Sequence, residues 1–277
     1  KKIFKEASLS SDIAGILHWD MSTMMPVNSR GQRAEQLAYL SKLSHDKIAS
    51  NEVADLIANS KNENLEKKDM LNLNEIEREH KLASSVPSDL VEKISKVSAT
   101  CEGVWQEAKK NSDFKLVEKN LEELIYLSKQ EANILCEVFN SSPYEALINK
   151  FEPLSNEQLI VDTFNDLQNY LSPLVETIIE KQKSEKILSI ETEINETKQK
   201  EIAQHIMKEI GFDFNRGRLD KSAHPFCGGA TDDVRITTRY NTKSPFSSLD
   251  GVMHETGHAL YELNLPNEWV GQPVGKS

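Results

Sequence analysis

The spacing of two histidines, His254 and His258, requires a helix at one place in the chain and indicates the chemistry of that helix. Residues four apart on an α-helix share one face and lie about one turn, 5.4 Å, apart along the axis. Both imidazoles can then bind a single Zn²⁺, and Glu255 can act as general base on a water held by the metal. The pattern His-Glu-x-x-His therefore predicts a metal hydrolase, and first of all a peptidase.

The residues around the two histidines predict a helix over 249–263. Apolar residues recur there at helical spacing, and Ser247 and Asp250 have the spacing of a capping box at the start. Pro245 precedes the segment and Pro266 follows it, so both ends are marked. The alternative is a chance pair of surface histidines. We prefer the metal site, because a chance pair would rarely fall in the middle of so well-bounded a helix.

A third metal ligand is not evident near the motif. The pattern His-x-x-Gly-x-x-His would need glycine at 261 and histidine at 264, where the chain has tyrosine and asparagine, so that group of zinc peptidases is excluded. Glu262 and Asp250 lie one helical turn from the histidines, and we expect one of them to orient a ligand histidine. A solvated helix carboxylate is an equally good interpretation of both. Glu268, in a loop after the helix, is a weaker ligand candidate.

The composition excludes several classes of partner. Charged residues make up 28% of the chain and the net charge is −11, which argues against nucleic acid or an anionic membrane. Three widely spaced cysteines argue against a disulfide framework and favour the cytoplasm. No apolar run approaches the ~18 residues of a membrane-spanning helix, and no signal-peptide core follows the first residues. Because the first residue is Lys rather than Met, we expect the chain to be trimmed at this end.

Most of the chain is predicted to be helical, because its apolar residues recur at helical spacing between charged ones. The predicted helices cover residues 1–18, 29–50, 64–84, 88–110, 113–138, 155–184 and 195–210. The polar stretch 59–68 is predicted to be a loop. Glycine is almost absent before residue 211 and frequent after it, which marks a change from scaffold to functional site.

The segment 233–240 alternates between apolar and polar residues, as a strand does. Arg235 lies on its polar face, and we expect an edge strand beside the cleft on which a peptide could pair by its backbone. The guanidinium of Arg235 could then bind a carboxylate through two hydrogen bonds. The alternative is an ordinary polar sheet face with Arg235 paired to a nearby acid. Upstream, His224 lies on a rigid turn before two glycines, where a lone histidine is more often structural than catalytic.

Taken together, these motifs resemble the carboxypeptidase Taq family of metallocarboxypeptidases. Several of them occur in the order expected for that family, spread over essentially the whole chain. They are Leu17-His-Trp-Asp20, Arg33-Ala-Glu-Gln-Leu37, Gly217-Arg-Leu-Asp220, His224-Pro-Phe226, Asp233-Val-Arg-Ile-Thr237, the His254 to Glu262 segment, and Gly271-Gln-Pro273.

The resemblance implies a fold and an activity. The fold would be mainly α, a large bundle-like, saddle-shaped subunit with a deep groove and a small β-sheet near the metal site, assembled as a homodimer. The activity would be removal of single residues from peptides with a free C-terminus. One divalent metal per subunit, zinc or in the test tube cobalt, would be held by His254 and His258, with Glu255 as general base. His224 and Arg235 would lie by the substrate, and His224 or Tyr261 could stabilise the oxyanion.

The chain lacks two motifs of that family. The family completes its metal site with a Glu in a His-Glu-Ser/Gly-Gln motif and carries a later Arg motif, and neither is present here. We therefore expect the third ligand to be a carboxylate beyond Ser277. Residues 1–210 would form the helical scaffold and groove wall, and 211–277 the first part of an incomplete catalytic region. On this interpretation the chain as given is expected to be metal-poor and nearly inactive.

Two other functions remain open at this stage. A helical oligoendopeptidase of the thimet type shares the His-Glu-x-x-His pattern, and cleavage inside a C-terminally amidated peptide would favour it. An inactive helical interaction protein could retain the motif without its chemistry, and failure of the full-length protein to bind zinc would favour that.

Overall fold

The computed structural model describes residues 1–153, 155–186 and 193–276. The chain forms two compact units. The larger contains residues 1–128 and 193–277, and the smaller contains residues 129–192. The predicted boundary at residue 210, between a helical scaffold and a catalytic region, is a functional boundary that does not correspond to these two compact units. It stays a prediction.

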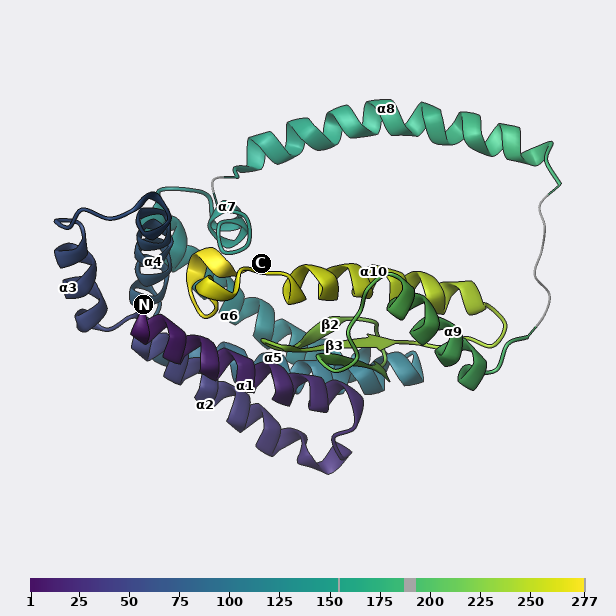
Figure 1. Ribbon diagram of the computed structural model, residues 1–277, viewed down its shortest axis with the longest axis horizontal. Helices are drawn as coiled ribbons and strands as arrows, with labels where there is room; N and C mark the ends of the chain where they lie inside the picture. The colour runs from purple at the N-terminus through teal and green to yellow at the C-terminus, as the bar shows by residue number, and fades with distance from the viewer. Residues whose placement is uncertain (154, 187–192, 277) are drawn as a thin grey trace. The chain divides into compact units, whose positions relative to one another are not determined.

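The larger unit is mainly helical, and its helices are labelled in Figure 1. Helix α2 packs along both α1 and α5, whereas α9 and α10 pack on one another and on the sheet. The helices are α1 (Lys2–Thr23), α2 (Arg30–Ile48), α3 (Asn51–Ser60), α4 (Lys67–Ser85), α5 (Ser88–Asn111), the first part of α6 (Lys115–Phe139), α9 (Glu196–Glu209) and α10 (Pro245–Leu263), with short 3₁₀ turns η1 (Val27–Ser29), η2 (Asn267–Trp269) and η3 (Pro273–Gly275).

The predicted mainly helical fold with a small sheet is confirmed, but two short helices, α3 and α7 (Pro143–Ile148), were not predicted. The predicted helix over 29–50 corresponds to α2, and no element was predicted over 51–58, where α3 lies. Ser50 caps α3, since its side chain accepts a hydrogen bond from the Val53 N–H at 3.4 Å. Val53 and Ile57 are buried and hold the helix in place. The loop predicted over 59–68 is accordingly confined to the residues between α3 and α4.

The smaller unit contains the end of α6, α7 (Pro143–Ile148) and α8 (Glu157–Lys183). Ser142 caps α7 by accepting from the Glu145 N–H at 3.1 Å, and Pro143 occupies the first helical position. An ion pair of 2.7 Å joins Lys150 to Glu131 of α6. None of the described residues of α8 is buried.

The sheet has three strands in the order β1-β3-β2. Strand β3 (Asp233–Thr238) pairs in parallel with β1 (Gly217–Lys221) and antiparallel with β2 (Cys227–Ala230). The expectation that the 233–240 strand lies at an edge is therefore wrong, because strands pair with it on both sides. The strand at the edge on this side is β2, and helix α1 packs against it.

Opposite faces of this sheet have opposite character, as the alternation of side chains requires. Leu219, Val234 and Ile236 are buried in one core cluster with residues of α9 and α10. On the other face, the register places Arg218 beside Arg235, and both guanidinium groups lie over the indole of Trp19 in α1. Helix α10 therefore covers the apolar face and α1 the charged face.

Helix α1 approaches the edge strand so closely that only glycine fits at the contact. A Cβ atom built on Gly15 would lie 2.1 Å from the carbonyl oxygen of Gly229 in β2, well inside van der Waals contact. Gly15→Ala is therefore expected to lower the free energy of unfolding by about 1–3 kcal/mol, because the helix must move away from the strand.

Denaturant unfolding of matched variants measures this effect. Gly31→Ala in α2 is the control, since nothing lies within 4 Å of its added Cβ. Alanine in an exposed helix stabilises by up to about 1 kcal/mol, so the control should be neutral or slightly stabilised. Equal effects of the two substitutions would show that the α1–β2 contact is looser than described.

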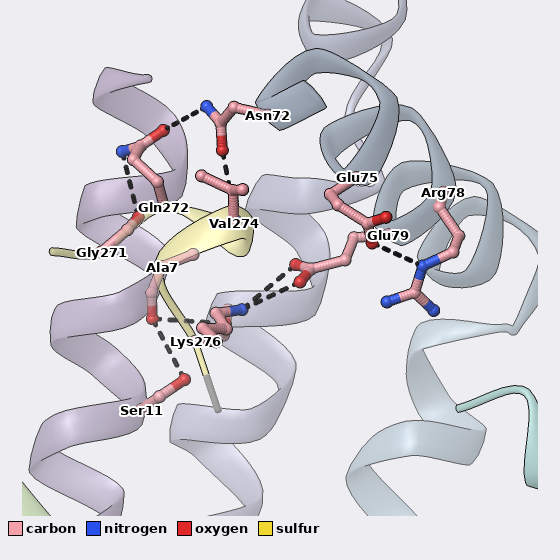
Figure 2. Close-up of polar contacts among 11 residues, drawn as sticks. Ala7, Ser11, Asn72, Glu75, Arg78, Glu79, Gly271, Gln272, Val274 and Lys276 are labelled. Carbon is pink, nitrogen blue, oxygen red and sulfur yellow. Dashed lines mark hydrogen bonds and ion pairs between the residues drawn. The ribbon is translucent and has the colours of Figure 1, made fainter. Parts of the chain in front are cut away.

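The turn formed by η2 and η3 is anchored to α1 and α4 by a small polar network (Figure 2). Asn72 of α4 is buried and donates to the Gln272 side chain at 3.2 Å, while its own oxygen accepts from the Val274 N–H at 3.4 Å. Gln272 in turn donates to the carbonyl of Lys1 at 3.1 Å, and Lys276 pairs with Glu79 at 3.1 Å. These hydrogen bonds join α4 to the turn of η2 and η3, although the two are about 200 residues apart in the sequence.

Candidate metal centre and peptide site

Helix α10, which carries the two histidines, begins earlier than the sequence suggested. Pro245 is its first residue and Ser244 its N-cap, with no side-chain capping bond. The predicted capping box between Ser247 and Asp250 is wrong, because both lie inside the helix and Ser247 bonds back to the Ser244 carbonyl at 2.7 Å. Proline at the first position needs no hydrogen-bond partner, so the helix can start there.

The imidazoles of His254 and His258 converge. Their Nε2 atoms lie 3.3 Å apart, and the two rings stand almost perpendicular, at 80°. Two nitrogen ligands at about 2.0–2.1 Å from a tetrahedral zinc ion would lie about 3.3–3.4 Å apart. The pair therefore fits two corners of a zinc site without any change of rotamer.

Two carboxylates accompany the histidines on α10. Glu255 is buried, with 9% of its surface exposed, and Glu262 is half-buried. Burial raises the pKa of the Cys227 thiol in β2 to about 12, and the negative charges of Glu255 and Glu262 add to this effect. Both carboxylates are therefore near Cys227. Cys227 is therefore a neutral thiol at physiological pH.

A third protein ligand is not found in the part of the chain that the structure describes, where no group of three or more His, Cys, Asp or Glu could hold a metal ion. Asp250 is exposed. Glu268, the weak candidate, accepts from Lys68 at 2.9 Å and from the Trp269 indole at 3.0 Å, and its pKa is lowered chiefly by the hydrogen bond from Lys68. Its carboxylate is therefore already engaged.

A cavity of about 700 Å³ opens beside α10. Helix α1 supplies one wall, the edge strand β2 a second and α10 a third, and the turn of η2 and η3 closes one end. Its polar lining residues include Ser8, Ser11, Asp12, Arg216, His224, Thr231, Asp232, Glu255, His258, Glu262 and Lys276. The volume suits several residues of an extended peptide.

His224 lines this cavity, on a turn that the hydroxyl groups of Ser222 and Thr237 hold in place. Ser222 donates to the His224 carbonyl at 2.6 Å, and its oxygen lies 2.7 Å from Oγ1 of Thr237. Thr237 is fully buried and accepts from the Phe226 N–H at 3.0 Å. The last residue of the Asp-Val-Arg-Ile-Thr motif thus fixes the turn that carries the His-Pro-Phe motif.

Arg235 lies elsewhere, on the face of the sheet that α1 covers. Its guanidinium binds both oxygens of Asp233, at 2.9 and 2.5 Å, and stacks on Trp19 at 4.5 Å. This is the arrangement of the structural alternative considered above, and a role of Arg235 at the substrate stays a prediction. The arginine that lines the cavity is Arg216, which pairs with Asp232 and donates to the Leu263 carbonyl at 3.3 Å.

Arg216 and Asp12 were not predicted from the sequence. Both are isolated charged residues outside the motifs described above. The available signal for Arg216 was the scarcity of arginine in this chain, since two of its few arginines precede the predicted strand. Asp12 gave no signal, because its place in the cavity depends on the packing of α1 against a strand more than 200 residues away.

His18 of α1 contacts Phe226 in the His-Pro-Phe turn. The ring of His18 meets that of Phe226 edge to face at 5.9 Å, and its Nε2 lies 2.8 Å from Glu102 of α5. The hydrogen bond to Glu102 raises the pKa of His18 above its usual 6.5.

The raised pKa of His18 predicts a pH-dependent contribution to stability. Since the folded pKa lies above the unfolded one, the contribution is complete below pH 6.5 and is lost as the pH rises through the folded value. His18→Gln should therefore destabilise by about half a kcal/mol near pH 5.5, a small amount because the pair is partly exposed. The difference from wild type should vanish near pH 9. Urea unfolding at several pH values measures it, and a pH-independent difference would rule out the charged pair.

Comparison with known proteins identifies the chain. All of it, residues 1–277, matches the family model described as carboxypeptidase Taq (M32) metallopeptidase. The chain belongs to this family. Carboxypeptidase 1 of Bacillus subtilis is 32% identical over 276 residues, which cover 97% of this chain and 54% of that protein. Thermostable carboxypeptidase 1 of Pyrococcus furiosus is 31% identical over 263 residues, which cover 94% and 52% respectively.

Solved structures give the same result for the fold. Metallocarboxypeptidase 1 of Trypanosoma cruzi superposes with a TM-score of 0.86 at 33% identity, covering 100% of this chain and 56% of that one. The resemblance inferred from the motifs is thus confirmed, and membership of this metallopeptidase family implies a divalent metal ion. The chain spans about half the length of the relatives it matches. In the described residues, no helix combines the length and apolar character needed to cross a membrane.

Proposed function

We propose that the full-length protein is a zinc-dependent carboxypeptidase that removes single residues from the C-terminus of peptides. The observation that carries the proposal is the convergence of the His254 and His258 Nε2 atoms to 3.3 Å, next to the buried Glu255 and a peptide-sized cavity. Membership of a metallopeptidase family with relatives named carboxypeptidases supports it. Cobalt, which accepts the same ligands, could replace zinc in vitro.

The chain's own residues would act as follows. His254 and His258 hold the metal, which when bound supplies Lewis acidity at the scissile carbonyl and a more acidic water. Glu255 takes a proton from the attacking water and returns it to the leaving amine. His224, on its rigid turn, or Tyr261 donates to the carbonyl oxygen as negative charge develops there.

Glu262 and the edge strand would have supporting roles. Glu262 lies one turn beyond His258 and would orient it or a neighbouring water. A substrate peptide would lie in the cavity that β2 lines together with α1 and α10, and not paired along β2, because α1 covers the middle of that strand at Gly229. The proposal also includes a cytoplasmic homodimer, which the widely spaced cysteines and the family resemblance support.

Mass spectrometry of a peptide digest tests this function. The full-length protein would be incubated with an N-terminally blocked peptide, beside a Glu255→Gln variant and a chelator control. A ladder of single losses from the C-terminus, absent from both controls, is the expected result. A C-terminally amidated copy of the peptide should be resistant. Internal fragments from that copy would instead indicate an oligoendopeptidase, and no cleavage by the zinc-loaded protein would refute the proposal.

A further inference from the structure

A relay of two hydroxyl groups holds the turn that carries His224. The Phe226 N–H donates to Oγ1 of Thr237 at 3.0 Å, and that oxygen lies 2.7 Å from Oγ of Ser222. Ser222 in turn donates to the His224 carbonyl at 2.6 Å. Since a hydroxyl group has one proton, Ser222 gives its own to His224 and accepts that of Thr237. The relay therefore runs from a backbone N–H to a backbone carbonyl, and each hydroxyl both donates and accepts once.

The two ends of the relay lie on either side of Pro225. The proline ring fixes its own φ and has no N–H, so this residue cannot hold the turn by donating a hydrogen bond. Thr237 of β3 is fully buried, and its backbone N–H also donates to the Phe226 carbonyl at 2.9 Å. Loss of the Thr237 hydroxyl would leave this backbone bond in place but would free the His224 side of the turn.

The same turn lies against α10, close to the proposed metal ligands. A Cβ atom built on Gly251 would lie 3.4 Å from Cγ of Pro225, an ordinary contact distance. Gly251 precedes His254 by three residues, so the two share one face of the helix and lie about 4.5 Å apart along its axis. His224, next to Pro225, lines the cavity together with His258. Where the turn is held therefore decides where the imidazole of His224 lies relative to α10.

On the basis of the proposed function, we propose that Thr237 is a positioning residue for the reaction and acts through Ser222 and the turn on His224. Thr237 is fully buried, so it does not itself touch the substrate. Without its hydroxyl the Phe226 N–H loses its acceptor and the Ser222 hydroxyl loses its donor, and the turn shifts. A displacement of about 1 Å in a group that acts on the substrate can lower the rate about a hundredfold.

Steady-state kinetics of the full-length, metal-loaded protein on a blocked peptide test this role. Thr237→Val keeps the branched shape of the side chain but removes the hydroxyl, and kcat should fall about 10–100-fold with KM nearly unchanged. Thr237→Ser, which restores the hydroxyl, should restore most of kcat. Ser222→Ala breaks the relay at its partly exposed end, where folding is least at risk, and should lower kcat in the same way.

The effect of Thr237→Val in a His224→Ala background decides whether Thr237 acts through His224. Residues that act through one group are not additive, so Thr237→Val should cause no further loss of kcat once the imidazole is absent. A further loss of the same size in that background would show that Thr237 supports the site in some other way. That result would overturn the assignment.

Thr238→Val is the matched control, because it removes a buried hydroxyl from the next residue of the same strand. Thr238 donates to the Ser248 carbonyl at 3.2 Å. That carbonyl belongs to α10 and already accepts a hydrogen bond within the helix, so the control leaves no partner unpaired and should keep kcat. Equal losses of kcat in Thr237→Val and Thr238→Val would show a general loosening of β3 and would refute the proposed role.

Hydrogen–deuterium exchange tests the relay apart from turnover. The amide of Phe226 should exchange about tenfold faster in Thr237→Val than in wild type, whereas Thr237→Ser and Thr238→Val should resemble wild type. If exchange changes in this way but the wild-type protein cleaves no peptide, the proposed function fails and the relay stands. If the wild type removes C-terminal residues but Thr237→Val alters neither exchange nor kcat, the role of Thr237 fails and the proposed function stands.

Discussion

Replacing Glu255 by glutamine is expected to lower kcat about a thousandfold while leaving the fold and the metal site intact. Glutamine keeps the size of the side chain but cannot take a proton, and a positioned general base contributes about 10²–10⁴-fold. Glu255 is the buried carboxylate next to His254 and His258, the proposed metal ligands, so no other group of α10 is as well placed. KM should change little, because the substrate contacts remain.

Steady-state kinetics with metal analysis of the same preparation check this prediction. Glu262→Gln is the matched control, since it removes a charge from the same helix one turn beyond His258. A supporting role for Glu262 predicts a loss of about 10–100-fold at most. If Glu255→Gln retained more than about a tenth of the activity, the proton would have to be taken by another group.

Removal of one ligand histidine is expected to have the second large effect. His258→Ala should weaken zinc binding by about a thousandfold or more, because loss of groups that merely orient the ligands already costs about 10–100-fold. Activity should be lost at ordinary zinc concentrations. Competition with a chromophoric chelator measures the affinity directly.

His224→Ala distinguishes the metal ligands from the other histidine of the cavity. His224 lies on the turn held by Thr237, away from α10 in the sequence, and is proposed to act on the substrate. This variant should keep its zinc and lose kcat. Loss of zinc from His224→Ala would identify His224 as a ligand and would replace the expectation of a carboxylate ligand from elsewhere.

The helices and the metal motif were predictable from the sequence because they depend on local spacing. Each long helix has apolar residues on one face, as in α6, where Leu127 and Leu135 are almost completely buried. The two histidines needed no more than a helix to bring their nitrogens together. Boundaries were less predictable, since α10 starts at Pro245, two residues before Ser247, the first residue of the predicted capping box.

The arrangement of the site depends on contacts that no local pattern records. Alternation along 233–238 predicted a strand, but it does not state how many neighbours the strand has, so the edge was assigned to β3 rather than β2. Arg235, which was predicted to bind the substrate, instead stacks on Trp19, a residue more than 200 positions earlier in the chain. The cavity is lined by Arg216. The place of Asp12 in the cavity wall likewise arises from tertiary packing alone.

The long sequence separation between α1 and its partners also bears on synthesis of the protein. Helix α1 is made first, yet β2 and the turn containing Gln272, against which it packs, are made about 200 residues later. At about 5–20 residues per second, the nascent helix waits roughly 10–40 s for these partners. During that interval the surface around Trp19 stays open to solvent and to chaperones. The cavity wall can therefore close only after the ribosome has passed α10.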